Sequence, residues 1–149
     1  MSTLVDTNIL TRSIYKADPL HQLAVNALDG LRQKGEQLCI VPQNLYEFWV
    51  VCTRPASQNG LGMIPSQVDA EISQLEPLFA FREDVPDVFR EWKLIVNQYQ
   101  VIGKNGHDAR LVAAMRVHNI GQLLTFNIND FQRFQGIVVL SPQQVISTP

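Results

Sequence analysis

Short apolar runs alternate with longer amphipathic segments along the chain. The runs are bounded by turn-forming residues and predict buried strands at residues 3–5, 38–41, 79–81, 122–126 and 137–140. Between them, apolar residues recur at helical spacing, which predicts helices over about 18–34, 43–54, 66–78, 86–99 and 107–118. Helices that separate strands in this way cover both faces of a parallel sheet. The pattern therefore predicts one α/β domain over residues 1–149, a sandwich around a central, mainly parallel sheet.

Proline, glycine and small polar residues mark the predicted ends of these elements. Asp18-Pro19 is typical of a helix start, with Asp18 as the N-cap and Pro19 at the first helical position. Gly35 is typical of a helix C-terminal cap. Residues 55–64 are rich in Pro, Ser, Asn and Gly, which predicts a mobile loop.

The composition excludes a strongly basic nucleic-acid-binding protein. The 149 residues are enough to bury a core, and 46% of them are hydrophobic, as in an ordinary soluble globular protein. The net charge is −2 and the pI is about 5.9, so the chain has no overall positive field. Any attraction to a nucleic acid must come from a few basic residues near a site, or from bound metal.

The cysteines and the apolar runs bear on the cellular compartment. Cys39 lies in a predicted strand and Cys52 in a predicted helix, so both are expected to be reduced thiols in the core. Polar residues interrupt the first apolar run almost at once, which is unlike a secretory signal peptide. No apolar run approaches the length that spans a bilayer. We therefore expect a cytoplasmic protein.

Four acidic residues occupy positions where α/β proteins bind ligands. Asp6 closes the first apolar run, Asp108 begins a helix, and Asp130 follows the strand that ends at Phe126. Glu47 lies inside an otherwise apolar helix. The carboxyl ends of parallel strands meet at one edge of a sheet, and ligands bind there. Each position also has a purely structural explanation, such as a helix cap for Asp6, a favourable helix dipole for Asp108 and an Asx turn for Asp130.

Glu47 is the most unusual of the four. Its neighbours from Leu45 to Val51 are nearly all apolar, and no basic residue lies three or four positions away. An unpaired buried carboxylate costs on the order of several kcal/mol, or it takes up a proton. Glu47 therefore occupies a narrow solvated stripe or points inward toward a partner, and the residues alone leave both possibilities open.

Carboxylates that are brought together repel one another, and a cation among them relieves the repulsion. Oxygen ligands of this kind favour hard divalent ions, Mg²⁺ or Mn²⁺, over zinc. The sequence has no histidine pair or cysteine cluster with zinc-site spacing. Its three histidines, His21, His107 and His118, are scattered, so we expect surface or capping roles for them. These observations indicate a metal-dependent enzyme that acts on a phosphate ester, with RNA as the favoured substrate.

Four segments of the chain carry a resemblance to a known family. They are Leu4–Leu10 with its acidic turn, Asn44–Phe48 with its helical glutamate, His107–Met115 with a third acidic residue, and the closing segment Leu124–Phe131. Together and in this order they resemble PIN-domain nucleases, and among these the VapC-like toxin ribonucleases of type II toxin–antitoxin pairs. The resemblance covers nearly the whole chain, and its specificity lies in the combination of the segments.

The resemblance implies a PIN-like three-layer sandwich and an Mg²⁺- or Mn²⁺-dependent endoribonuclease that hydrolyses RNA phosphodiester bonds. The residues that it implies as catalytic and metal-binding are Asp6, Glu47, Asp108 and Asp130, with Asn127 as a further metal ligand. Many members of the family carry an aspartate at the position of Asn127. An amide oxygen can ligate a metal or position water, but it contributes no negative charge.

The resemblance also implies supporting residues and partners. Thr7, Asn8 and Thr125 are similar to polar residues that hold the carboxylates in place. Arg110 is expected to contact the substrate phosphate or to pair with an acidic residue. The family usually pairs with a small antitoxin protein, a segment of which blocks the acidic cleft, and it commonly forms homodimers.

Two other enzyme or signalling classes fit these residues less well than a nuclease does. A phosphatase of the haloacid dehalogenase type would use Asp6 as its nucleophile, but it requires an aspartate where this chain has Asn8. A phospho-receiver domain requires an adjacent acidic pair after the first strand, which the sequence lacks. A catalytically impaired RNA- or protein-binding module remains compatible with Asn127. RNA cleavage with Mg²⁺ or Mn²⁺, lost in EDTA or after Asp6→Ala, is expected of the nuclease alone.

Overall fold

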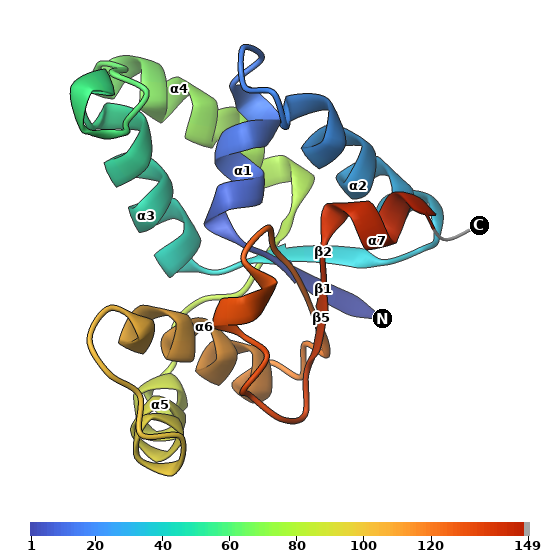
Figure 1. Ribbon diagram of the computed structural model, residues 1–149, viewed down its shortest axis with the longest axis vertical. Helices are drawn as coiled ribbons and strands as arrows, with labels where there is room; N and C mark the ends of the chain where they lie inside the picture. The colour runs from blue at the N-terminus through green and yellow to red at the C-terminus, as the bar shows by residue number, and fades with distance from the viewer. Residues whose placement is uncertain (148–149) are drawn as a thin grey trace.

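The centre of the molecule is a parallel β-sheet, seen in a computed structural model that describes residues 1–147 (Figure 1). Its strands are β1 (Ser2–Val5), β2 (Gln37–Ile40), β3 (Ala80–Phe81), β4 (Gln122–Leu124) and β5 (Val138–Leu140). Within the described residues the strand order is β3-β2-β1-β4-β5, and every neighbouring pair is parallel. The predicted parallel sheet is confirmed. The last two residues of the expected domain lie outside the described residues.

Helices cover both faces of this sheet and produce three layers (Figure 1). One face carries α1 (Thr7–Ile14), α2 (His21–Gln33), α3 (Pro42–Thr53), α4 (Pro65–Leu75) and α7 (Pro142–Ser147). The other face carries α5 (Pro86–Gln98) and α6 (Asn105–Val117), which pack against each other. The α/β sandwich predicted from the sequence is therefore confirmed.

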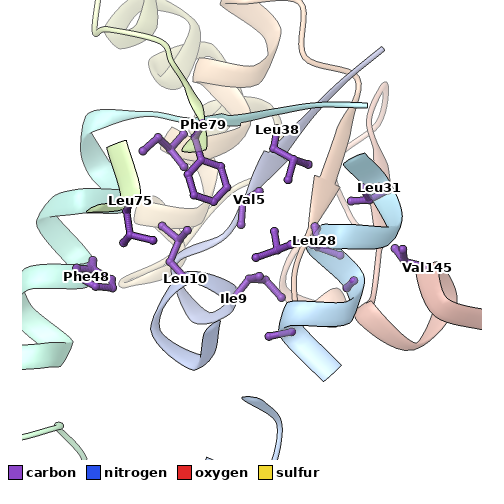
Figure 2. Close-up of a cluster of buried hydrophobic side chains, with 14 of the residues drawn as sticks. Val5, Ile9, Leu10, Leu28, Leu31, Leu38, Phe48, Leu75, Phe79 and Val145 are labelled. Carbon is purple, nitrogen blue, oxygen red and sulfur yellow. The ribbon is translucent and has the colours of Figure 1, made fainter. Parts of the chain in front are cut away.

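Successive residues of the central strands face opposite layers, as the two-residue repeat of a strand requires. Val5 and Leu124 belong to the cluster on the α1 and α2 side, whereas Leu4 and Leu123 belong to the cluster on the α5 and α6 side. All four side chains are fully buried. Figure 2 shows Val5 facing the apolar side chains of α1 and α2. Full burial of one such side chain contributes about 1.5–3 kcal/mol, so the two clusters fix β1 at the centre of the sheet.

The predicted start of α2 at Asp18 is wrong, whereas its predicted C-terminal cap at Gly35 is confirmed. α2 begins at His21, so the prediction of Asp18 as its N-cap is wrong. The Asp18 carboxylate accepts the backbone N–H of Leu20 at 2.8 Å and lies 3.6 Å from Nε of Arg12, so it closes a turn before the helix. Gly35 follows the end of α2 with a φ of 84°, which confirms the predicted C-terminal cap.

Residues 55–64 form the predicted loop, with a short 3₁₀ turn at Ala56–Gln58. The backbone N–H groups of Leu61 and Met63 donate to carbonyls of the last turn of α3 at 3.1 and 2.9 Å. The N–H of Gly62 donates to the carbonyl of Arg54 at 2.9 Å. These bonds hold the loop along α3, so its backbone is not free in the way that the sequence suggested.

The helix α7 lies in a segment for which the sequence predicted no element. In α7, the N–H of Ser141 donates to Oε1 of Gln144 at 2.8 Å, and the N–H of Gln144 donates to Oγ of Ser141 at 3.1 Å. This reciprocal pair is a capping box, which the sequence Ser141-Pro142-Gln143-Gln144 already encodes.

The remaining expectations concern the thiols and membrane association. Cys39 and Cys52 are both buried and form no disulfide within the described residues, as predicted. Among residues 1–147, no helix has both the length and the apolar character needed to cross a membrane.

Candidate active site

Asp6 lies at the carboxyl edge of the sheet, directly after β1, and is the N-cap of α1. Its Oδ1 accepts the backbone N–H of Thr7 at 2.8 Å, and its Oδ2 accepts the hydroxyl of Thr125 at 2.7 Å. The residue is 7% exposed. The structural explanation of Asp6 as a helix cap is therefore correct. The same two hydrogen bonds also fix the carboxylate at the edge where ligands of parallel sheets bind.

Thr125, which follows β4 and is fully buried, connects the polar residues around Asp6. While donating to Asp6, its Oγ1 accepts the side-chain amide of Asn8 at 3.4 Å and the N–H of Asn127 at 2.9 Å. Asn8 in turn accepts the N–H of Phe126 at 3.3 Å. Thr125 and Asn8 thus lie where residues that orient a carboxylate are expected.

Glu47 lies on α3, and its partner is Gln43, one helical turn earlier. Nε2 of Gln43 donates to Oε1 of Glu47 at 2.6 Å and to the backbone carbonyl of His107 at 2.8 Å. Oε1 of Gln43 accepts Nη1 of Arg110 at 3.2 Å. Gln43 is 5% exposed, so its amide connects α3 to the first turns of α6 in a region that is largely shielded from solvent. The carboxylate of Glu47 is therefore paired, by a neutral group and not by a cation.

Gln43 and Asn44 are two buried polar residues around the site that sequence reasoning missed. Asn44 is fully buried; its Oδ1 accepts the N–H of Val41 at 2.9 Å and its Nδ2 donates to Oγ1 of Thr7 at 3.5 Å. Both residues left a local signal. Gln43 precedes Glu47 by four residues, a spacing at which helical side chains meet. Asn44 is the third residue of a helix that begins with proline, where a side chain can cap the helix start.

Asp108 lies in the first turn of α6, and its electrostatics connect it to the other carboxylates. Burial, followed by the negative charges of Asp130, Asp6 and Glu47, raises the pKa of Asp108 to about 7. Burial also raises the pKa of Asp6 to about 6, against the lowering effect of its two hydrogen bonds and with smaller contributions from Glu47 and Asp130. Burial likewise raises the pKa of Glu47. Groups from four parts of the sequence therefore influence one another across a small space.

A cleft of about 350 Å³ joins three of these carboxylates, since Asp6, Glu47 and Asp108 all line it. Asn127 lines the same cleft and is exposed. Asp130 ends a 3₁₀ turn at Ile128–Asp130, is exposed, and lines a neighbouring hollow that also includes Asn127. The structure thus brings Asp6, Glu47, Asp108 and Asn127 together and places Asp130 at the rim.

The fit of these residues to a metal can be judged from their arrangement. Within residues 1–147, no three His, Cys, Asp or Glu side chains already stand close enough to share one ion. The donor set of carboxylate and amide oxygens nevertheless suits a hard divalent cation, which would relieve the repulsion that contributes to the raised pKa values. Glu47 and Asp108 are only partly buried and line the same cleft as Asp6.

The remaining predicted residues have peripheral positions. Nη2 of Arg110 lies 2.8 Å from the carboxylate of Asp84, so the ion-pair alternative for Arg110 is the one observed. The rings of His21 and His118 each contact a backbone carbonyl, at 2.8 and 3.0 Å, in keeping with the structural roles expected of them. His107 is exposed at the start of α6.

No known family profile matches the chain, and no curated protein matches it. Solved structures of low identity share its fold. One of them is VapBC2 from Rickettsia felis, bound to a DNA fragment from its promoter. It has a TM-score of 0.69 at 17% identity, and the match covers 95% of this chain and 98% of that chain. VapBC-1 from nontypeable Haemophilus influenzae has a TM-score of 0.69 at 14% identity, over 96% and 99%. VapC20 from Mycobacterium tuberculosis, described as a sarcin-ricin loop cleaving toxin, has a TM-score of 0.57 at 17% identity. The match covers 81% of this chain and 86% of that chain. These likenesses confirm the fold that the resemblance implied.

Proposed function

We propose that this chain is an endoribonuclease that depends on Mg²⁺ or Mn²⁺, and that it is the toxin of a toxin–antitoxin pair. The observation that carries the proposal is the convergence of Asp6, Glu47 and Asp108 on one cleft at the carboxyl edge of a parallel sheet. Burial and mutual repulsion raise their pKa values and so disfavour the ionised set, which a bound cation would stabilise.

The ion would be held by Asp6, Glu47 and Asp108, with the amide oxygen of Asn127 as a further ligand and Asp130 contributing charge from the rim. When bound, it would supply Lewis acidity and a water of lowered pKa for attack on a phosphodiester. Since Asn127 is neutral, we propose that the site holds one ion more tightly than any second one.

The contribution of the chain itself is to position the ligands. The hydroxyl of Thr125 and the N–H of Thr7 fix both oxygens of Asp6, and the amide of Gln43 fixes one oxygen of Glu47. Groups that are held in place before the substrate arrives need little reorganisation during the reaction, and this preorganisation is a large part of catalysis in phosphoryl transfer.

The proteins with a similar fold favour RNA as the substrate and a protein as the partner. VapC20 is described as a toxin that cleaves the sarcin-ricin loop, and the structures from Rickettsia felis and Haemophilus influenzae are described as VapBC. We propose that this chain likewise acts in the cytoplasm, forms a homodimer and is inhibited by a small antitoxin protein. Growth arrest on expression, relieved by a small protein encoded beside the gene, would test the partner.

Cleavage by the purified protein tests the activity. Total cellular RNA is expected to be cut with Mg²⁺ or Mn²⁺ and left intact in excess EDTA. Asp6→Asn is expected to lower the rate at least about 100-fold, because loss of the central ligand removes several kcal/mol of charge stabilisation. Asp69→Asn, which changes an exposed carboxylate on α4, is the matched control and should cleave like the wild type. Equal cleavage by Asp6→Asn and wild type would refute the proposal.

A non-catalytic module that binds RNA or protein is the second candidate. It is favoured by the absence of a ready-made metal group within residues 1–147 and by the neutral Asn127. The expected outcome for such a module is stable RNA binding with no cleavage under Mg²⁺, Mn²⁺ or other divalent ions. A phosphatase with Asp6 as nucleophile gains no support, because Asn8 is engaged with Thr125 and Phe126 and cannot act as an acid.

A further inference from the structure

A second groove, of about 570 Å³, adjoins the cleft along α3. It shares Glu47 and Val51 with the cleft, so the two hollows meet at the carboxylate of the site. Figure 1 shows α3 and the start of α6 on the same side of the molecule. The groove has lining residues from both helices, which are Gln43, Tyr46, Glu47, Val50, Val51, Arg54, His107 and Arg110. We call it the α3 groove.

Arg54 is the residue of the α3 groove whose state calls for an explanation. Among the described residues, its Nε is the buried side-chain atom that has no hydrogen-bond partner, and no ion pair is found for its guanidinium. Buried polar groups in native proteins are nearly always paired. Arg110 in the same groove, by contrast, is paired with Asp84. An unpaired guanidinium beside an open groove is suited to an anionic ligand.

The backbone at Arg54 is held firmly. Its carbonyl accepts the N–H of Gly62 at 2.9 Å, and Gly60 packs so closely that an added Cβ would lie 1.9 Å from the Arg54 carbonyl oxygen. The base of the arginine side chain is therefore fixed by the loop at residues 55–64. A fixed cation loses less conformational entropy when it binds an anion than a mobile one does.

The α3 groove also presents an aromatic ring. Tyr46 is 63% exposed, which is high for tyrosine, a residue of intermediate burial in folded proteins. Exposed aromatic rings next to cations are the combination by which proteins bind single-stranded nucleic acid, with bases stacked on the rings and phosphates near the cations. The cleft itself is acidic, so a polyanion needs such positive charge beside it.

We propose that the α3 groove binds the nucleotide next to the scissile phosphodiester of a single-stranded RNA segment, with its base on Tyr46 and a phosphate at Arg54. The inference rests on the proposed nuclease function and adds to it the direction in which the RNA strand leaves the acidic cleft. The guanidinium of Arg54, which has no ion-pair partner within residues 1–147, together with the exposed ring of Tyr46, favours RNA over an apolar partner as the occupant.

The first test measures the electrostatic contact. A short, fluorescein-labelled single-stranded RNA of random sequence is titrated with Asp6→Asn protein in excess EDTA, where no cleavage is expected, over a range of potassium chloride concentrations. Arg54→Gln in the same background is expected to lower the slope of log affinity against log salt by about 0.7, the value for one phosphate contact on a single strand. Lys34→Gln, at the end of α2 and at the opposite edge of the sheet, is the matched control and should leave the slope unchanged.

The second test measures stacking and does not depend on Arg54 being replaceable. Tyr46→Leu changes an exposed side chain, so folding should be retained, and a thermal melt checks this. RNA affinity is expected to fall by roughly five- to a hundred-fold, whereas Tyr46→Phe should bind like the parent protein. An unchanged RNA affinity in Tyr46→Leu together with an unchanged salt slope in Arg54→Gln would overturn the proposal. So would a Tyr46→Leu protein whose only defect is a changed self-association, because the groove would then be a face between copies.

The two proposals fail in different ways. If wild-type protein cleaves RNA and both variants bind RNA like their parent, the proposed role of the α3 groove is wrong and the proposed nuclease function stands. If the wild type binds RNA with the predicted variant effects but cleaves nothing under any metal, the groove stands and the nuclease is wrong. If the protein neither binds nor cleaves RNA, both are wrong.

Discussion

The side chains of Asp6 and Asp108 are a source of repulsion in the protein without metal. Burial raises the pKa of both residues, and the charges of Glu47 and Asp130 raise both further. The charge of Asp6 also raises the pKa of Asp108. Removing one charge should therefore relieve the repulsion, although it also removes a ligand. This gives opposite effects on stability with and without an ion.

Asp108→Asn is expected to raise the melting temperature in EDTA at pH 7.5 by about 3 °C, corresponding to roughly 1 kcal/mol after solvent screening of a partly exposed group. Millimolar Mn²⁺ should stabilise the wild type and leave the variant nearly unchanged. Scanning calorimetry of both proteins, with Asp69→Asn as the exposed control, measures both effects. An equal gain from Mn²⁺ in Asp108→Asn and wild type would contradict the proposed role of Asp108.

The amide of Gln43 acts through Glu47. Gln43→Met keeps the size of the side chain but removes its donors to Glu47 and to the carbonyl of His107. We expect a loss of about 10- to 100-fold in kcat with little change in KM, as for other residues that orient a ligand, and weaker binding of Mn²⁺. Gln22→Met, at an exposed glutamine that makes a similar bond within α2, is the control. A loss of thermal stability with normal kcat would show that the amide only joins the two helices.

At the scale of elements, local pattern predicted where the chain forms strands and helices but not how their ends are bonded. Val5 and Leu124 could be placed because a buried strand is a short apolar run between turns. Asp18 was misplaced because an aspartate before proline suits a turn as well as a helix cap, and only its bonds to Leu20 and Arg12 decide between them.

The candidate site was predictable in part for the same reason. Asp6 and Asp108 stand at the ends of elements, which local sequence marks. The contacts of Gln43 with His107 and Arg110 join residues 64 and 67 positions apart, so they depend on how α3 packs against α6 and leave no local pattern. The 3₁₀ turn that carries Asp130 to the rim was likewise not visible, because several turn types suit its Asx-rich sequence.

The loop that lines the cleft gives a prediction at this scale. In Gly60→Ala the new methyl group would meet the carbonyl of Arg54, so the loop must move away from α3. We expect a loss of roughly 2 kcal/mol or more in the free energy of unfolding and reduced RNA cleavage, measured by urea denaturation and activity. Gly121→Ala is the matched control, since its Cβ would meet nothing within 4 Å, and it should be nearly neutral. Equal effects of the two substitutions would mean that the loop does not depend on close contact at Gly60.

For the molecule as a whole, the raised pKa values make stability depend on pH. In the unfolded chain Asp6 and Asp108 lose their protons near pH 3.8, but in the folded protein only near pH 6 and 7. Between about pH 4 and 7 the folded state therefore holds more protons than the unfolded state, and this contribution to stability falls as the pH rises.

The prediction compares the wild type with the double variant Asp6→Asn/Asp108→Asn in EDTA. From pH 4.5 to 7.5, we expect the unfolding free energy of the wild type to fall by roughly 1–3 kcal/mol relative to that of the variant. Urea denaturation at several pH values measures it. The difference should shrink when Mn²⁺ is present, because a bound cation keeps both carboxylates ionised. A difference that is constant with pH would show that the two groups titrate normally.

The hydrogen bond between Thr125 and Asp6 spans 119 residues and has a consequence for synthesis. The strand β1 is synthesised long before Thr125, whose hydroxyl donates to Asp6, and before the strand β4 that pairs beside it. An unfinished chain therefore contains most of the acidic residues without a formed cleft. The arrangement of carboxylates described above would therefore form only after β4 and Thr125 have been synthesised and have paired with the first strand.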